Sequence, residues 1–169
     1  PVPICSAVSE PAAPPAMPSP PPMPPYIPGP STFTTVGTIE QLRAAISSPI
    51  NGSVNVYLPP GAVFALDGAP IHIGPVSVQL ASDGVGATID AQHKSRVFEM
   101  ARTGHLQLSS MTLANGHAAT GGTMLMLGGT VHLANGCSIA NCTSLDAAGA
   151  FYIAGSETTV TLSSGSSIV

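Results

Sequence analysis

The chain has 169 residues, of which 4 are Lys or Arg and 8 are Asp or Glu, so charged side chains make up 7% of the sequence. So few cations exclude the basic surface that nucleic-acid binding requires, and we expect no nucleic-acid partner. No apolar run approaches the roughly 18 to 20 residues of a transmembrane helix, so we expect no membrane span. A surface this poor in charge needs glycans or burial in an assembly to stay soluble.

Residues 1–30 are a proline-rich segment that holds 13 of the 18 prolines. Proline fixes φ and disfavours helix in the residue before it, so the segment predicts an extended polyproline II arm, with a disordered linker as the alternative. The composition resembles hydroxyproline-rich glycoproteins of algal and plant walls, which implies hydroxylated, glycosylated prolines. We therefore divide the chain into an arm at 1–30 and a folded domain at 31–169.

One short helix is predicted at about residues 38–47. Thr38 is a suitable N-cap, and Gln41 three positions later completes a capping box. An apolar stripe at helical spacing follows, and Pro49 and Asn51-Gly52 end it. A short amphipathic helix in this position is expected to cover the first coil of the structure that follows.

From Val54 the apolar residues alternate with a period of two, which is typical of strands. Similar units recur, at intervals of 22, 28, 25 and 29 residues when measured on Leu58, Leu80, Leu108, Leu133 and Leu162. A repeat of strands at this period predicts a β-solenoid. The long, unequal intervals exclude a left-handed hexapeptide solenoid, while a β-sandwich remains the structural alternative.

The stretches ATIDAQHKSRVFEM, HLQLSSMTLANGHAATGGT and GGTVHLANGCSIANCTS resemble right-handed parallel β-helices of the pectate-lyase-like superfamily. The closest likeness is to surface proteins with repeats of the polymorphic-outer-membrane-protein type. The usual Gly is Ala91 here, and the GGA turn is degenerate at Gly122-Thr123 and Gly149-Ala150. The resemblance implies an all-β coil of three parallel sheets, an asparagine ladder at Asn115 and Asn141, and two inward columns: Leu108, Leu133 and Leu162; Met111, Cys137 and Ser166.

No catalytic or metal-binding constellation stands out, so we expect neither an enzyme nor a cofactor. Enzymes that this fold resembles need several clustered acids, whereas the eight acids here are scattered along the chain. The histidines have no metal-ligand spacing. The only concentration of charge suggests a ligand face at Asp90, His93, Lys94 and Arg96, with a solvated loop as the alternative.

Two further sets of residues carry covalent chemistry. Asn51-Gly52-Ser53 and Asn141-Cys142-Thr143 are N-glycosylation sequons, and Asn51 is favoured because the amide of Asn141 is also assigned to the ladder. The three cysteines, Cys5, Cys137 and Cys142, are candidates for a disulfide. Cys137 also fits a small core residue, and Cys5 is a candidate partner for Cys142 in the same or a neighbouring chain.

These features predict a secreted, extracellular or cell-surface structural or adhesive glycoprotein that assembles with itself, end to end, into a fibre or wall layer. Glycans are expected on Asn, and on hydroxylated Pro, Ser or Thr. The sequence begins without Met and stops in mid-repeat, so we expect a processed form or fragment and a covered last coil. The alternatives are a cell-surface carbohydrate-binding or carbohydrate-active β-helix, and a bacterial autotransporter passenger.

Overall fold

The computed structural model describes residues 33–155, 157–163 and 165–169. The chain divides between residues 30 and 31, at the predicted boundary. The predicted polyproline arm, including Cys5, lies outside the described residues, and so does Ser156. The text below concerns the domain from residue 31 onward.

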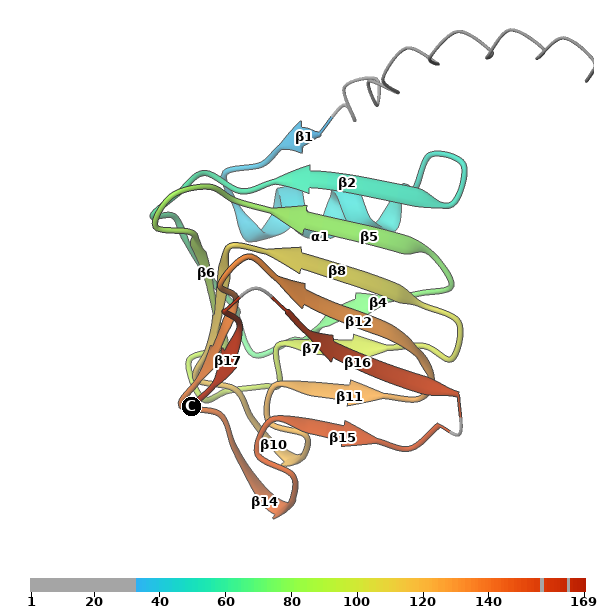
Figure 1. Cartoon of the computed structure of the whole chain (residues 1–169), viewed down its shortest axis with the longest axis vertical. Coiled ribbons are helices and arrows are strands. Elements are labelled where there is room, and N and C mark those ends of the chain that lie inside the picture. Colours follow the sequence, from blue (N-terminus) through green and yellow to red (C-terminus); the bar gives the residue numbers. More distant parts are fainter. Residues whose placement is uncertain (1–32, 156, 164) are drawn as a thin grey trace, which may run out of the picture. The chain divides into compact units, whose positions relative to one another are not determined.

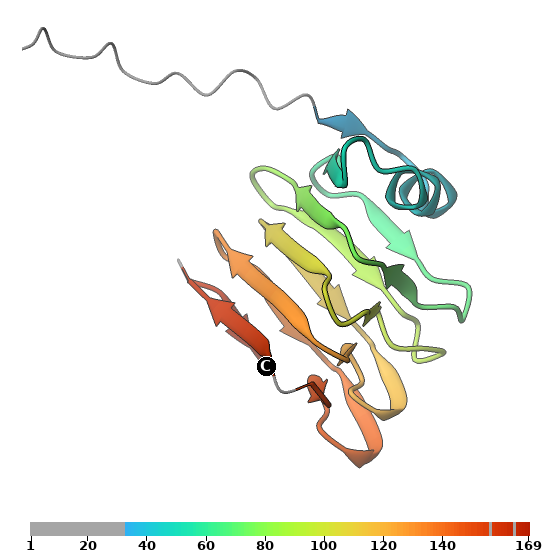
Figure 2. The same ribbon diagram turned by 90° about the vertical axis from the view of Figure 1, so that its right-hand side faces the viewer.

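The domain is a right-handed parallel β-solenoid of about five coils, as Figures 1 and 2 show. Every coil contributes one strand to each of two or three parallel sheets, so strands far apart in sequence lie side by side. Sheets A, B and C form the sides of the coil, and a fourth sheet, D, is inserted between B and C in the third and fourth coils. The predicted all-β parallel solenoid is confirmed.

Sheet A consists of β1 (Thr34–Thr35), β2 (Ser53–Tyr57), β5 (Ser77–Ala81), β8 (His105–Ser109), β12 (Gly129–Ala134) and β16 (Thr158–Leu162). Sheet B consists of β3 (Val63–Ala65), β6 (Ala87–Asp90), β9 (Met111–Ala114), β13 (Ser138–Ala140) and β17 (Ser167–Ile168). Sheet C consists of β4 (Ile71–Ile73), β7 (Phe98–Met100), β11 (Met124–Met126) and β15 (Phe151–Ile153). Sheet D consists of β10 (His117–Thr120) and β14 (Thr143–Ala147).

The core is built from columns of apolar side chains that point into the coil from successive strands. Leu108 is paired with Leu133 and Leu133 with Leu162, so the first predicted column is confirmed. Above Leu108 the column continues through Leu80 to Val56. The first interval is therefore 24 residues, from Val56 to Leu80, and the predicted 22 residues from Leu58 was wrong. A shift of two residues keeps every side chain on the same face, so the alternating pattern could not distinguish the two registers.

The predicted helix is confirmed as α1 (Ile39–Ser47). The Thr38 hydroxyl accepts a hydrogen bond from the Gln41 N–H at 3.2 Å, and the Gln41 side chain accepts one in return from the Gly37 N–H at 2.8 Å. Leu42 and Ile46 are buried in the core that the coil encloses. Figure 2 shows α1 lying across the first coil, at the N-terminal end of the stack. It is too short to cross a membrane, and no helix of the described residues is long and apolar enough to do so.

One arginine ties α1 to the first coil. The guanidinium group of Arg43 donates hydrogen bonds to the carbonyl oxygens of Ala69 and Pro70, just before β4, and lies 3.4 Å from a carboxylate oxygen of Asp67. Because the two carbonyls belong to the loop that enters sheet C, the helix is fixed to two sides of the coil. The N-terminal coil therefore has a cover that is built into the domain.

Candidate functional site

The predicted ligand face lies at the corner that follows β6. Asp90 ends that strand, and its Oδ1 accepts hydrogen bonds from the backbone N–H of Gln92 at 2.8 Å and from Nδ2 of Asn115 at 2.9 Å. Gln92 and His93 both have positive φ, a conformation that needs local support outside glycine. The carboxylate of Asp90 thus holds a tight corner and joins it to the next coil.

The other three residues of this face are close in sequence but are not bonded to one another. His93 and Lys94 are exposed, and the Lys94 ammonium donates to the Gln92 side chain at 2.8 Å. Arg96 is half-buried, and its Nη1 is buried with no hydrogen-bond partner among the described residues. No three His, Cys, Asp or Glu side chains in the described part of the chain are grouped so that they could hold a metal ion.

Asn115 and Asn141 occupy equivalent corners of successive coils. Both have a φ of 54°, and the backbone N–H that follows Ala114 bonds to the carbonyl oxygen of Ala140 at 3.1 Å. The bond from the Asn115 amide goes to Asp90 in the coil before it, and the described residues show no bond between the two asparagine amides. This carboxylate–amide contact between coils could not be read from the asparagine repeat alone.

Both sequon asparagines have exposed side chains. Asn51 lies in the turn between α1 and β2 with a φ of 51°, and Asn141 lies at the corner between β13 and β14. Each corner is therefore accessible to a glycan. Glycosylation itself stays a prediction at both positions.

Cys137 and Cys142 are separate free thiols. Cys137 is buried in the core, as one predicted role required, and burial raises the pKa of its thiol. Cys142 is half-buried, where its sulfur accepts a hydrogen bond from the Gly116 N–H and donates to the Ala140 carbonyl, both at 3.3 Å. A bond from either cysteine to Cys5 stays a prediction, because Cys5 lies outside the described residues.

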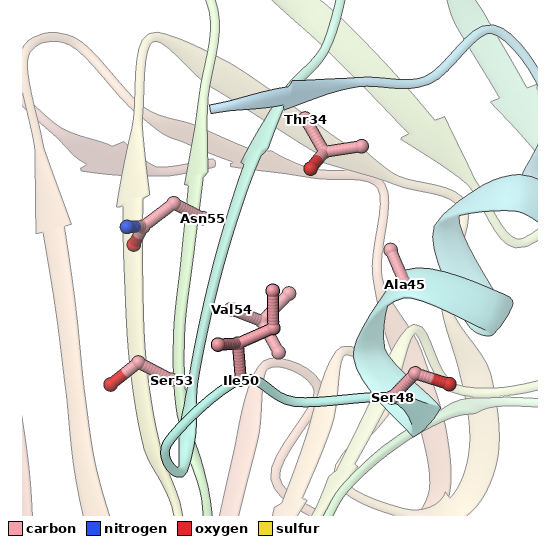
Figure 3. A pocket seen from close by; sticks show the side chains of 7 residues that line it. All are labelled: Thr34, Ala45, Ser48, Ile50, Ser53, Val54 and Asn55. Carbon is pink, nitrogen blue, oxygen red and sulfur yellow. The ribbon is translucent and has the colours of Figure 1, made fainter. Parts of the chain in front are cut away.

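The hollows on the surface are shallow and lie against the ends and edges of the coil. One, with a volume of about 300 Å³, lies between α1, β1 and β2 (Figure 3). Its walls are small or apolar, including Ala45, Ile50 and Val54, and no charged residue lines it. A second hollow of about 490 Å³ lies at the turns between sheets C and A, with Arg102 and Glu157 among its lining residues. Neither brings together a nucleophile and a base.

The outer face of sheet A carries no charge. Its outward side chains alternate with the buried ones, and one column runs in register across five strands: Asn55, Gln79, Gln107, His132 and Thr161. No strand of sheet A contains Asp, Glu, Lys or Arg. The face therefore offers neutral hydrogen-bond donors and acceptors, spaced about 4.8 Å apart from strand to strand.

The last coil exposes side chains that are buried in every coil before it. Leu162 is 40% exposed although its register partner Leu133 is fully buried, and Ile168 is 49% exposed against 1% for Ile139. On sheet C, Ile153 is 49% exposed above a fully buried Met126. We call the surface formed by these inward-facing residues of the last coil the open coil end: Phe151, Ile153, Val160, Leu162 and Ile168.

No family model, curated protein or solved structure matches the chain. The fold and the surfaces described above are therefore the basis for a functional assignment.

Proposed function

We propose that the protein is a non-catalytic structural or adhesive β-solenoid that joins other β-structure through its open coil end. The observation that carries this proposal is the change in exposure along single register columns, from 0% at Leu133 to 40% at Leu162. Fully burying one such side chain is worth about 1.5 to 3 kcal/mol. Several of them on one surface give a substantial driving force for association.

The strands at this end also lack the features that usually prevent association. Natural edge strands are protected by Lys, Pro, inward charges or a covering element. β15, β16 and β17 read FYI, TTVTL and SI, and contain none of these residues. Their unpaired backbone groups and apolar side chains together favour pairing with another strand.

The cellular setting is part of the same proposal. The low charge, the two exposed sequons and the proline-rich residues 1–30 support a secreted or cell-surface glycoprotein with glycans on Asn51 and Asn141. We also propose that the coil is of the pectate-lyase-like type, and that it is closest to surface proteins with polymorphic-outer-membrane-protein-type repeats. Corners at Asn115 and Asn141 support that likeness, because the resembling repeats carry Asn-Gly at this place.

The experiment is to measure the mass of the purified chain by light scattering over a wide concentration range, and to image it by electron microscopy. We expect assemblies that grow with concentration and contain more than one solenoid. A single solenoid at every concentration would contradict the proposal. Peptide mass spectrometry after secretion tests the glycans, and unmodified Asn51 and Asn141 would remove that part.

A second candidate function is binding of a neutral polysaccharide by the outer face of sheet A, because that face is free of charge and its middle column carries two glutamines in register. Glycan arrays with the wild-type protein and a Gln79→Ala, Gln107→Ala variant test it. Asp90→Ala and Arg96→Ala test the corner after β6 in parallel. Loss of binding in the glutamine variant alone would assign the site to sheet A, and no binding by the wild type would reject this candidate.

A further inference from the structure

We infer that two copies of the chain join tail to tail, with the open coil end of one against the open coil end of the other and a two-fold axis between them. This inference rests on the proposed function, because both use the open coil end. It goes further by naming the occupant of that surface and the symmetry of the contact.

The first argument is that the two ends of the solenoid are different. At the N-terminal end, Leu42 and Ile46 of α1 are buried against the first coil, and Arg43 holds the helix to the loop before β4. A head-to-tail stack would have to remove α1 and expose its apolar face. The closed end is therefore no partner for the open coil end, whereas a second open coil end is, because it has the same exposed strand edges and apolar columns.

The second argument concerns the backbone of β16. The N–H of Ser163 bonds to the carbonyl oxygen of Leu133 on β12. Because successive N–H groups of a strand point to opposite sides, the N–H groups of Val160 and Leu162 point to the open edge. A two-fold axis perpendicular to the coil axis places β16 antiparallel to β16 of the second copy. An antiparallel ladder is slightly more stable per residue than a parallel one.

The third argument is the charge of the surface that would face itself. Identical charges meet across a two-fold axis, so a charged end would repel its copy. The three last strands carry no charge, and the acids of the last part of the chain are Asp146 on β14 and Glu157 just before β16. The apolar centre of the contact is therefore neutral, and the acids flank it.

A two-fold contact is closed. It yields a particle of two solenoids with a helix α1 at each far end, and coil ends alone would not extend it into a filament. This differs from the fibre that the sequence suggests, because a fibre through coil ends requires both ends of each solenoid to be available.

The test uses the chain of residues 1–169 and measures its mass by light scattering, with electron microscopy of the particles. We expect twice the chain mass at high concentration. Val160→Pro removes an edge donor without breaking the ladder to β12, and Leu162→Lys places a charge on the apolar surface. Each should weaken association at least about tenfold.

A matched control is Val85→Lys, since Val85 is 87% exposed in the turn between β5 and β6, away from the open coil end. It should leave association unchanged. Circular dichroism of each variant checks that the solenoid still folds, and Leu162→Lys keeps the test decisive if Val160→Pro does not fold. Thr161→Cys adds a geometric check, because oxidation should link two such chains through their β16 strands.

The outcomes separate this inference from the proposed function. Filaments, or dimers in which Leu162→Lys has no effect, would overturn the tail-to-tail contact and leave a structural assembly in place. A monomer at every concentration would overturn both. A longer natural chain that stays monomeric, with further coils over β16, would overturn the inference alone.

Discussion

At the scale of single residues, the two described cysteines have different chemistry although only four residues separate them. Cys137 is buried, and burial raises the pKa of its thiol above the ordinary value of 9.0. The thiolate is the reactive form, so Cys137 is inert in the folded protein. Cys142 lies half-buried at the corner after β13.

We predict that a mildly alkaline alkylating reagent labels Cys142 well before Cys137 in the native protein. Both should react at similar rates in denaturant, where neither is shielded. Peptide mass spectrometry separates the two sites from each other and from Cys5. Equal labelling rates in the native state would contradict the buried position of Cys137.

Glycine is required at one corner and dispensable at another. A Cβ added at Gly116 would overlap the carbonyl oxygen of Gly122 and lie 3.2 Å from the Cys142 sulfur, whereas a Cβ at Gly74 meets nothing within 4 Å. We predict that Gly116→Ala destabilises the domain by about 1 to 3 kcal/mol, the usual cost of overpacking. Gly74→Ala is the control and should be near neutral in urea unfolding. A stable Gly116→Ala protein would mean that this corner can move.

At the scale of elements, the cap of α1 depends on a short polar motif. Thr38→Ala removes the acceptor for the Gln41 N–H, and we expect a loss of about 1 kcal/mol in the free energy of unfolding. Thr103→Ala is the matched control, since Thr103 is exposed and its side chain makes no hydrogen bond among the described residues. Urea unfolding of the two variants measures the difference. If both variants behave alike, the cap does not stabilise the helix.

The same helix end gives a dependence on pH. The pKa of Glu40 is lowered from 4.5, first by its hydrogen bond to the backbone N–H and then by that to the Thr38 hydroxyl. A carboxylate with a lowered pKa in the folded state stabilises the fold above pH 4.5, and this contribution is lost as the pH falls through the folded value. We predict that wild type is more stable than Glu40→Gln at neutral pH and that the difference disappears in acid. A difference that persists in acid would assign the effect to something other than ionisation.

The elements show how far the sequence could predict the structure. Alternation and a period in the twenties were sufficient for a solenoid, and the capping motif at Thr38 was sufficient for α1. The first register was not determined, because Val56 and Leu58 both face inward and either could pair with Leu80. The insertion of β10 and β14 as a separate sheet, and the Asn115–Asp90 bond, depend on contacts between coils that local patterns do not encode.

At the scale of the whole molecule, stability is distributed unevenly along the coil. Leu133 is fully buried, whereas Leu162 in the same column is 40% exposed. We predict that Leu133→Ala costs about 2 to 5 kcal/mol in unfolding free energy and that Leu162→Ala costs clearly less in the monomer. Denaturant unfolding at low concentration measures both. Equal losses would mean that the last coil is already covered in the monomer.

The helix over the first coil has a further consequence, for the order in which the solenoid comes apart. Each coil contacts only its neighbours, so such a fold opens like a zipper from whichever end is least secured. With Arg43 and the buried face of α1 holding one end, opening starts at β16 and β17 and moves toward β2. Amide protons of the last coil should therefore exchange first and those of the first coils last, so that the molecule has a built-in direction of unfolding.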